Sequence, residues 1–567
     1  MEQYSNSFTN LDDFVKSKVN ELTSIDLQLE NCKLNDEQLS LLNTCLKKGE
    51  KLETLILNLQ KQSISDSQIN KLYAKYTYIK KLIGICDNMS NDQQYAHIQK
   101  LYYAFGKISN IPSVYPNQNQ MQVQGYILLQ DVFANLINLK NLKLNFDGYS
   151  IKDDGAFAIS AAFSKCQMLV NLNLLLWNNQ IGDRGVSSIG LGISGCTKLT
   201  ALTLNMADNL FGKQGAISIG MGLSNCKMLT RLEINLQNNL ICDEGASAIG
   251  KALSSCQQLN NLNFQLWQNV IGDNGASGIG FGLSKCTQLT ELYFNLSNNQ
   301  IGDVGASAIG DAISNCNLLI RLSLQLWQNQ IGDKGASSIG LGLSKCTQLK
   351  NLELIINNNL IQQEGISEIG SALICFKLLT DLYFSIQRQN ISYDKGAQSF
   401  GLGLSYCNQL VNLEIGMSEQ KIGDEGASAI GKALYNNKML NTLNLQLWIN
   451  EIGDRGAFQI GLGLTQCSQL RSLNFGITKN QIGNEGASAI GIALGSFKQL
   501  TDLNFQIWQN QIGNEGALKI GQGLGQCSQL QRLHFGIEQN QIEDQGVSSI
   551  GIALGSLKLL TYLHFQI

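Results

Sequence analysis

The sequence is poor in proline, in charge and in long apolar stretches. Only two of its 567 residues are proline, charged residues make up 15%, and the net charge is −3. A chain so weakly charged has no basic surface to track a phosphate backbone, so we predict no nucleic-acid binding. It has no polybasic block for an anionic membrane surface, and no stretch approaches the roughly 20 apolar residues that cross a bilayer.

The N-terminus lacks the apolar run of a signal peptide. Without such a leader we expect a cytoplasmic protein, and we expect its 15 cysteines to be reduced thiols rather than disulfides.

Glycine is abundant, with 56 residues, and its spacing reveals an internal repeat. The glycine of a D-x-G-A motif recurs every 30 residues, with a single 31-residue step whose extra residue lies in residues 387–396. Regular spacing on this scale is typical of a solenoid, in which each unit packs only on its neighbours. The recurring glycines are Gly155, Gly185, Gly215, Gly245, Gly275, Gly305, Gly335, Gly365, Gly396, Gly426, Gly456, Gly486, Gly516 and Gly546.

The first half of each unit has the pattern of a strand. In the unit that begins at Leu259, residues Leu262, Phe264 and Leu266 alternate with polar or aromatic residues, and a period of two predicts a strand. Asn269 follows, where its side-chain amide can bind the turn backbone and stack as a ladder. The opposite side of this strand carries Asn263, Gln265 and Trp267.

The second half of the unit has the pattern of a helix. Ala276, Ile279 and Leu283 follow spacings of three and four, which predict one buried helical face. Asp273 precedes them and is expected to cap the N-terminus of its own helix. Gly280 lies in mid-helix, where glycine costs about 1 kcal/mol relative to alanine, so we infer that it permits close helix packing. Equivalent glycines are Gly190, Gly220, Gly250, Gly310 and Gly340.

This unit resembles the leucine-rich repeat, L-x-x-L-x-L-x-x-N-x-L, and in particular the ribonuclease-inhibitor type. The signature G-D-x-G-A-x-x-L of that type is nearly verbatim in residues 332–339, and the resemblance covers about residues 136–567. It implies an α/β solenoid, curved like a horseshoe, with a parallel sheet on the concave face and helices on the convex face. Leu266 departs from the pattern and predicts strands that are longer by two residues.

The chain outside this array is less regular. Residues 1–24 are predicted to form a helical cap, and residues 25–83 to form degenerate repeats. Residues 84–135 break the pattern and are predicted to hold an irregular loop and a helix. Residues 136–567 then form about fourteen regular repeats. The sequence does not decide which of three regions binds a partner: the segment 84–124, the concave face or the C-terminal edge.

No motif predicts catalysis or a cofactor. The G-x-G-x-x-G match in residues 190–195 lies within and after a helix rather than between a strand and a helix, and no P-loop, zincin or kinase signature occurs. The cysteines form one column, whereas zinc needs converging ligands, so we predict buried thiols and no metal. The column is Cys166, Cys196, Cys226, Cys256, Cys286, Cys316, Cys346, Cys375, Cys407, Cys467 and Cys527.

The concave face supplies the candidate binding residues, since tryptophan and tyrosine often anchor interfaces. Trp267 and Trp327 are 60 residues apart, as are Trp448 and Trp508, which indicates that the unit that duplicated was a pair of repeats. An alternative role for the tryptophans is to stiffen the sheet. The two histidines occupy equivalent positions and are either a pH-sensitive contact or ordinary surface residues. The candidates are Trp177, Trp267, Trp327, Trp448, Trp508, Tyr293, Tyr383, Gln265, Gln325, Gln446, Gln506, His534 and His564.

These observations predict a non-catalytic scaffold that binds other proteins and no small-molecule substrate. The resemblance implies a subunit of a larger assembly, with a cytoskeletal or ciliary (axonemal) setting as an analogy. The alternative it implies is a GTPase-activating or regulatory protein of the Ran GTPase-activating type. A carbohydrate-binding role for the tryptophan and amide surface is a further alternative.

Overall fold

The computed structural model divides into two compact units, Met1–Cys286 (the N unit) and Thr287–Ile567 (the C unit), and each is described separately. The predicted segment 84–135 lies outside the described residues, as does most of 25–83. The structure describes residues 6–9, 11–17, 22, 24–28, 54–58, 138–148, 151–164, 166–387 and 393–566.

The N unit contains parallel strands in which each strand pairs with the next one along the chain. From β4 onward the register is an offset of 30 residues, so that Leu232 pairs with Leu262. Because side chains alternate along a strand, this register places equivalent residues of successive repeats in columns. The strands are β1 (Asn6–Phe8), β2 (Ser24–Gln28), β3 (Thr54–Asn58), β4 (Asn141–Asn145), β5 (Asn171–Leu175), β6 (Ala201–Asn205), β7 (Arg231–Asn235) and β8 (Asn261–Gln265).

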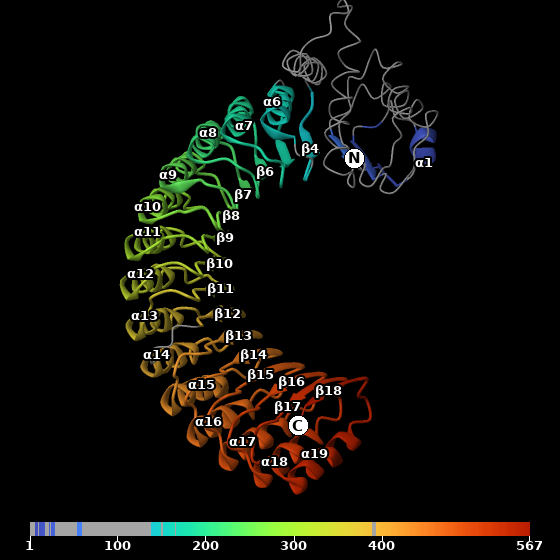
Figure 1. Cartoon of the computed structure of the whole chain (residues 1–567). Helices are drawn as coiled ribbons and strands as arrows, with labels where there is room; N and C mark the ends of the chain where they lie inside the picture. Colours follow the sequence, from blue (N-terminus) through green and yellow to red (C-terminus); the bar gives the residue numbers. More distant parts are fainter. Residues whose placement is uncertain are drawn as a thin grey trace, which may run out of the picture. The chain divides into compact units, whose positions relative to one another are not determined.

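Helices alternate with these strands and cover one side of the sheet (Figure 1). Their apolar faces pack on the sheet, since Ala276, Ile279 and Leu283 are almost completely buried, as predicted. The helices are α1 (Leu11–Lys16), α6 (Lys152–Phe163), α7 (Asp183–Gly195), α8 (Lys213–Leu223), α9 (Cys242–Leu253) and α10 (Asp273–Leu283).

The C unit repeats the same strand and helix arrangement, with the sheet on the inner side of its bend (Figure 1). Its strands are β9 (Glu291–Asn295), β10 (Arg321–Gln325), β11 (Asn351–Ile355), β12 (Asp381–Ser385), β13 (Asn412–Gly416), β14 (Thr442–Gln446), β15 (Ser472–Gly476), β16 (Asp502–Gln506), β17 (Arg532–Gly536) and β18 (Tyr562–Gln566).

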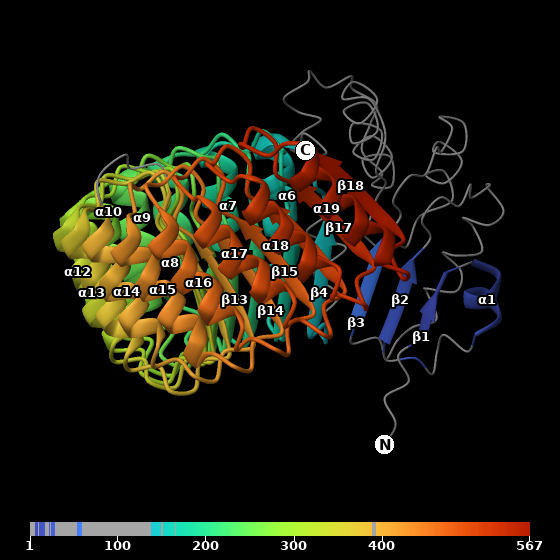
Figure 2. The same ribbon diagram turned by 90° about the horizontal axis from the view of Figure 1, so that it is seen from below.

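The helices of the C unit lie next to one another in a single layer (Figure 2). Within the residues that the structure describes, none of the helices of either unit is long and apolar enough to cross a membrane. The C-unit helices are α11 (Asp303–Ser314), α12 (Asp333–Leu343), α13 (Gln363–Leu373), α14 (Asp394–Leu404), α15 (Asp424–Asn436), α16 (Asp454–Leu464), α17 (Asn484–Leu494), α18 (Asn514–Leu524) and α19 (Asp544–Ser556).

The predicted α/β solenoid of alternating strands and helices is confirmed in both units. The single 31-residue step leaves the sheet register intact, because Asp381 pairs with Asn412 in the same way that Asn351 pairs with Asp381. The extra residue therefore lies between β12 and α14, as the sequence predicts. The backbone ladder also continues past the strand ends, where the Asn238 N–H donates to the Trp267 carbonyl at 3.0 Å, and Leu266 is fully buried.

The predicted asparagine ladder is confirmed. The side-chain amide of Asn209 donates to the carbonyls of Leu176 in the preceding repeat and Met206 in its own, at 2.9 and 3.0 Å. Its Oδ1 accepts the backbone N–H groups of Asn179 and Ile181 at 3.0 Å. One side chain thus binds buried turn backbone of two repeats, which would otherwise lack partners at a considerable cost in stability.

The predicted role of the aspartate before each helix is wrong in one respect. Asp243 makes no side-chain cap on its own helix; its Oδ1 accepts the N–H groups of Gly272 and Gly275 at the start of the next helix, at 2.6 and 3.0 Å. The same contact joins Asp454 to Gly483 and Gly486. The carboxylate therefore accepts hydrogen bonds from helix N–H groups of the following repeat that would otherwise lack partners, and it links consecutive repeats.

The helical glycines are required for close packing, as predicted. A Cβ placed on Gly250 would lie 2.4 Å from the Cα of Ile279, and one on Gly310 would lie 2.4 Å from the Ser338 carbonyl oxygen. Backbone atoms cannot give way as side-chain tips can, so the helix spacing depends on the missing side chain.

Ten of the eleven residues of the cysteine column are buried, and all eleven are free thiols. The prediction is wrong for Cys375, which is partly exposed because Phe376 fills the buried position of that repeat. The Sγ of Cys527 lies 3.3 Å from the Leu494 carbonyl, and burial raises the pKa of this thiol to about 12. A thiol that stays protonated at neutral pH is a poor nucleophile and a poor metal ligand, so the cysteines act as core residues.

The N-terminal region contains a strand that the sequence did not predict. β1 pairs with β2, and β2 pairs with β3 at the 30-residue offset expected of degenerate repeats. Helix α1 lies within the predicted cap, and its Phe14 is buried against Phe8 with ring centroids 5.2 Å apart. β3 pairs directly with β4, although the irregular segment 84–135 lies between them in the sequence.

Candidate functional site

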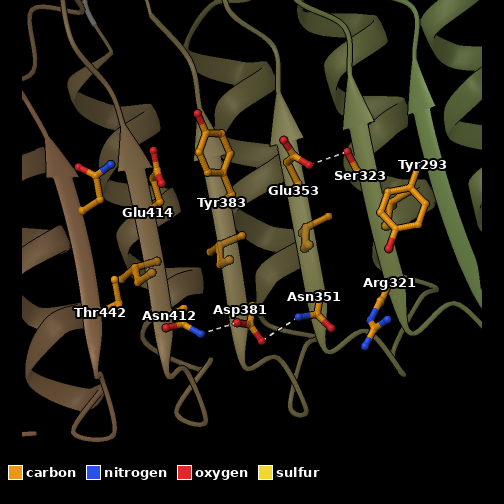
Figure 3. Close-up of a pocket in the computed structure, with 15 residues that line it drawn as sticks. Tyr293, Arg321, Ser323, Asn351, Glu353, Asp381, Tyr383, Asn412, Glu414 and Thr442 are labelled. Atoms are coloured by element: carbon orange, nitrogen blue, oxygen red, sulfur yellow. Dashed lines mark hydrogen bonds between the residues drawn. The ribbon is translucent and has the colours of Figure 1, made fainter. Parts of the chain in front are cut away.

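The exposed side of the C-unit sheet, which we call the sheet face, contains an open hollow of about 530 Å³. Residues from β9 to β14 line it (Figure 3). Its polar lining includes Tyr293, Arg321, Glu353, Asp381, Tyr383 and Glu414.

The register of the sheet explains why these residues meet. The third residue of each strand faces outward, between two buried apolar residues, and parallel pairing places these third residues in one row. Two glutamates flank a tyrosine in this row, each one strand away from it (Figure 3). The row is Tyr293, Ser323, Glu353, Tyr383, Glu414 and Asn444.

Neutral groups hold both glutamates in place. The hydroxyl of Ser323 donates to one oxygen of Glu353 at 2.6 Å, and the amide of Gln325 donates to the other at 3.1 Å. The Asn444 side chain is hydrogen-bonded to Glu414. The carboxylates are therefore oriented by side chains that carry no positive charge.

A second row follows the first residue of each strand, at the other end of the hollow (Figure 3). Asp381 accepts hydrogen bonds from Asn351 at 2.8 Å and Asn412 at 2.6 Å. Arg321 forms an ion pair with Glu291, with 3.1 Å between Nη1 and Oε1. The single guanidinium of the lining is thus engaged with a carboxylate outside the hollow.

The electrostatic balance of the hollow is unfavourable to its own negative charges. Burial raises the pKa of the Glu414 carboxyl and the nearby Glu353 raises it further, although the bond from Asn444 opposes this. Burial, with the charges of Glu414 and Glu353, also raises the pKa of Tyr383. A further positive charge in the hollow would therefore be favourable, and the residues that line it do not provide one beyond Arg321, which is paired with Glu291.

Next to the hollow, from β14, which borders it, to β17, the sheet face carries mostly amides and glycines. Gln446 donates to Asn444 at 2.7 Å and Gln506 donates to Asn504 at 3.0 Å. Gly476 leaves space for Gln446 to lie across it, because a Cβ there would be 2.2 Å from the Gln446 Oε1. The stretch also carries Asp502 and Arg532, which form an ion pair with each other, so its charges balance and its amides bind one another.

The candidate tryptophans all lie two residues past the strand ends rather than in the middle of the sheet. Trp177 is exposed and its Nε1 donates to Asp208 at 2.5 Å, while the Trp267 indole donates to Gln237. Trp327, Trp448 and Trp508 in the C unit are half-buried, and Lys479 Nζ lies 5.3 Å from the ring centroid of Trp508.

The candidate histidines lie next to each other, away from the hollow. His534 on β17 and His564 on β18 have ring centroids 5.4 Å apart, and Tyr562 lies 4.9 Å from His534. Two of the thirteen candidates, Tyr293 and Tyr383, line the hollow. A third, Gln325, donates a hydrogen bond to Glu353, which also lines it. Gln265 donates to Asn263 in the N unit.

Sequence reasoning missed the carboxylates of the hollow as site residues. Glu353 and Glu414 lie in the same outward column as the two tyrosines, and two like charges flanking a tyrosine in that column were the available signal. Asp381 and Arg321 occupy the first strand position, whose outward direction the repeat pattern alone does not reveal. Among the residues that the structure describes, no group of three or more His, Cys, Asp and Glu side chains could hold a metal ion.

Comparison with family models finds a match to the leucine-rich repeat at residues 285–310, 322–340 and 466–491. In these three stretches the chain contains leucine-rich repeats. The match does not distinguish the ribonuclease-inhibitor type from other types of this repeat. A search of curated proteins finds no match.

Two solved structures are similar to this chain. An internalin of Listeria monocytogenes shares 22% identity over 71% of this chain and 83% of its own, with a TM-score of 0.38. The ectodomain of the Arabidopsis receptor kinase HAESA, in complex with a peptide hormone, shares 16% identity over 76% of this chain and 79% of its own, with a TM-score of 0.29.

Proposed function

We propose that this protein is a non-catalytic scaffold that binds another protein on the sheet face of its C unit. The observation that carries the proposal is the hollow of about 530 Å³, which is lined by side chains from six consecutive strands. Parallel strands lie about 4.8 Å apart, so the hollow extends over roughly 24 Å from the first of these strands to the last. A surface of that extent suits a polypeptide segment better than a small substrate.

The frame behind the hollow supports this function because it is rigid. The apolar side of every strand that lines the hollow is buried, and the asparagine ladder binds the turns at the strand ends. Side chains held on such a frame lose little conformational freedom when a partner binds, which favours affinity. The half-buried tryptophans at the strand ends provide further apolar contact area of the kind that is frequent at interfaces.

The proposal is tested by site-specific photo-crosslinking in cells that naturally contain the protein. A photoreactive phenylalanine analogue replaces Asn412, an exposed residue of the lining, or Gln522, an exposed residue on helix α18. We expect a protein adduct from position 412 and much less of it from position 522. Adducts of equal yield at both positions, or intramolecular products alone, would contradict the proposal. The cytoskeletal or ciliary setting stays a prediction, and the identity of the adduct tests it.

A further inference from the structure

The hollow has an excess of negative charge that nothing in its lining balances. Three carboxylates line it, those of Glu353, Asp381 and Glu414, against one guanidinium, that of Arg321. The guanidinium forms its ion pair with Glu291. A protein partner that brings a positive charge into the hollow would therefore improve the electrostatic energy of both surfaces.

The two glutamates are spaced to receive an inserted side chain. Their strands, β11 and β13, are separated by one strand, so they lie about 9.6 Å apart in the sheet. The intervening residue is Tyr383, whose ring lies between the two glutamates (Figure 3). A Lys or Arg head group placed there could reach both carboxylates and contact the aromatic ring, which itself attracts cations.

The neutral partners of the glutamates leave their charges in place. Ser323 and Gln325 donate to Glu353, and Asn444 is bound to Glu414, so both carboxylates are oriented without being neutralised. The β14–β17 stretch differs, because its amides are satisfied by one another. Charge complementarity therefore favours the hollow, and not the neighbouring amide surface, as the place where a charged partner residue enters.

We propose that the hollow binds a Lys- or Arg-bearing segment of a protein partner, with the cationic group between Glu353 and Glu414 on Tyr383. This inference rests on the proposed scaffold function and names the chemistry of its ligand. An arginine suits the site best, since its planar guanidinium can donate to both carboxylates and stack on the phenol ring.

The first test selects displayed random peptides of twelve residues on the full chain. Pools are then compared on the wild type and on an E353Q/E414Q double variant. We expect Lys and Arg to be enriched in the wild-type pool and the enriched peptides to be lost on the double variant. A pool without basic residues that is lost on a Tyr383→Ala variant would overturn the inference while leaving the scaffold function intact.

The second test measures affinity with a defined probe. A labelled peptide of alternating glycine and arginine is compared with the same peptide in which citrulline, the uncharged isostere, replaces arginine. We expect the arginine peptide to bind the wild type at least about tenfold more tightly, and this preference to weaken as salt is added. E353Q/E414Q should abolish most of the preference.

The matched control for charge is E485Q/E515Q. It removes the same two negative charges from exposed positions in the first turns of α17 and α18, and it should keep the preference for arginine. An equal loss with this control, or equal binding of free spermidine and of the peptide, would overturn the proposal of a protein segment in the hollow. Circular dichroism of each variant establishes that it is folded.

Discussion

In the C unit, the two sides of the same strands differ in how much their residue types vary from repeat to repeat. At the second strand position, on the buried side, β9 to β14 all carry leucine, whereas the outward-facing third position carries Tyr, Ser, Glu, Tyr, Glu and Asn. The buried side must fit one packing geometry in every repeat, because interiors are close-packed. The exposed side is under no such restraint, so its variation is available for recognition. The leucines are Leu292, Leu322, Leu352, Leu382, Leu413 and Leu443.

The comparison predicts that substitutions of the repeated structural residues (the helical glycines, the asparagine ladder and the aspartates before the helices) change the free energy of unfolding strongly. Substitutions on the sheet face should change it little. The sharpest test is Gly491→Ala on α17, where a Cβ would lie 2.5 Å from the backbone of Lys519. We expect this change to lower the free energy of unfolding by about 3 kcal/mol through overpacking.

Gly551 on α19 is the matched control, because it occupies the equivalent helix position and a Cβ there would meet no atom within 4 Å. Gly551→Ala should stabilise by about 0.5–1 kcal/mol, since alanine favours the helix. Denaturant unfolding of both variants checks the pair. Equal effects of the two changes would refute the close-packing role of the glycines.

The second prediction removes one rung of the asparagine ladder. Asn510 donates to the Ile477 and Ile507 carbonyls at 3.1 and 3.0 Å and accepts the Ile482 N–H at 3.1 Å. Asn510→Ala leaves these buried groups unpaired and should cost about 2–3 kcal/mol. The exposed neighbour Gln511, changed to alanine, should alter the denaturation midpoint very little. A comparable loss in Q511A would mean that the ladder is not the cause.

The third prediction concerns the link between consecutive helices. Asp454 Oδ1 accepts the N–H groups of Gly483 and Gly486 at 2.8 Å. Asp454→Ala should cost about 1 kcal/mol, which is typical of a lost helix cap. Asp454→Asn should cost less, because Asn484 makes the same two contacts to the next helix at 2.9 Å. Thermal unfolding that ranked D454N at or below D454A would contradict this reading of the contact.

The smallest effect is expected on the sheet face, at Glu414. Its raised pKa means that the folded state binds a proton more readily than the unfolded state, so its charge destabilises the fold as pH rises through the raised pKa. The groups that act on it or lie beside it are Glu353, Tyr383 and Asn444. Glu414→Gln should therefore stabilise the chain at pH 7, by less than about 1 kcal/mol because the site is open to solvent.

The pH dependence separates this explanation from a simple packing effect. The advantage of E414Q should vanish as pH falls below the unfolded pKa of a glutamate, where the wild-type carboxyl is protonated in both states. Unfolding curves at pH 7 and at acid pH measure it. A variant that is less stable than the wild type at pH 7 would show that the negative charge contributes to the fold.

Much of the strand and helix arrangement could be predicted because the same local pattern recurs in every repeat. The period of two at Leu262 and Phe264, the period of three to four at Ile279 and Leu283, and the terminal Asn269 each describe local geometry. The aspartate was predicted less well, because its partners lie 29 and 32 residues further along the chain, in the next helix. Local spacing cannot show which of two neighbouring helix N-termini a carboxylate serves.

The sequence by itself determined the repeat, the alternation of strand and helix, the buried cysteine column and the outward column that contains Tyr293 and Tyr383. Only the tertiary structure decided which of those outward residues act together. Parallel pairing places Glu353, Tyr383 and Glu414 on three adjacent strands, although about 30 residues separate each from the next in sequence. It also decided that Arg321 is engaged by Glu291, because a contact between charges depends on distance in space, which the order of residues does not give.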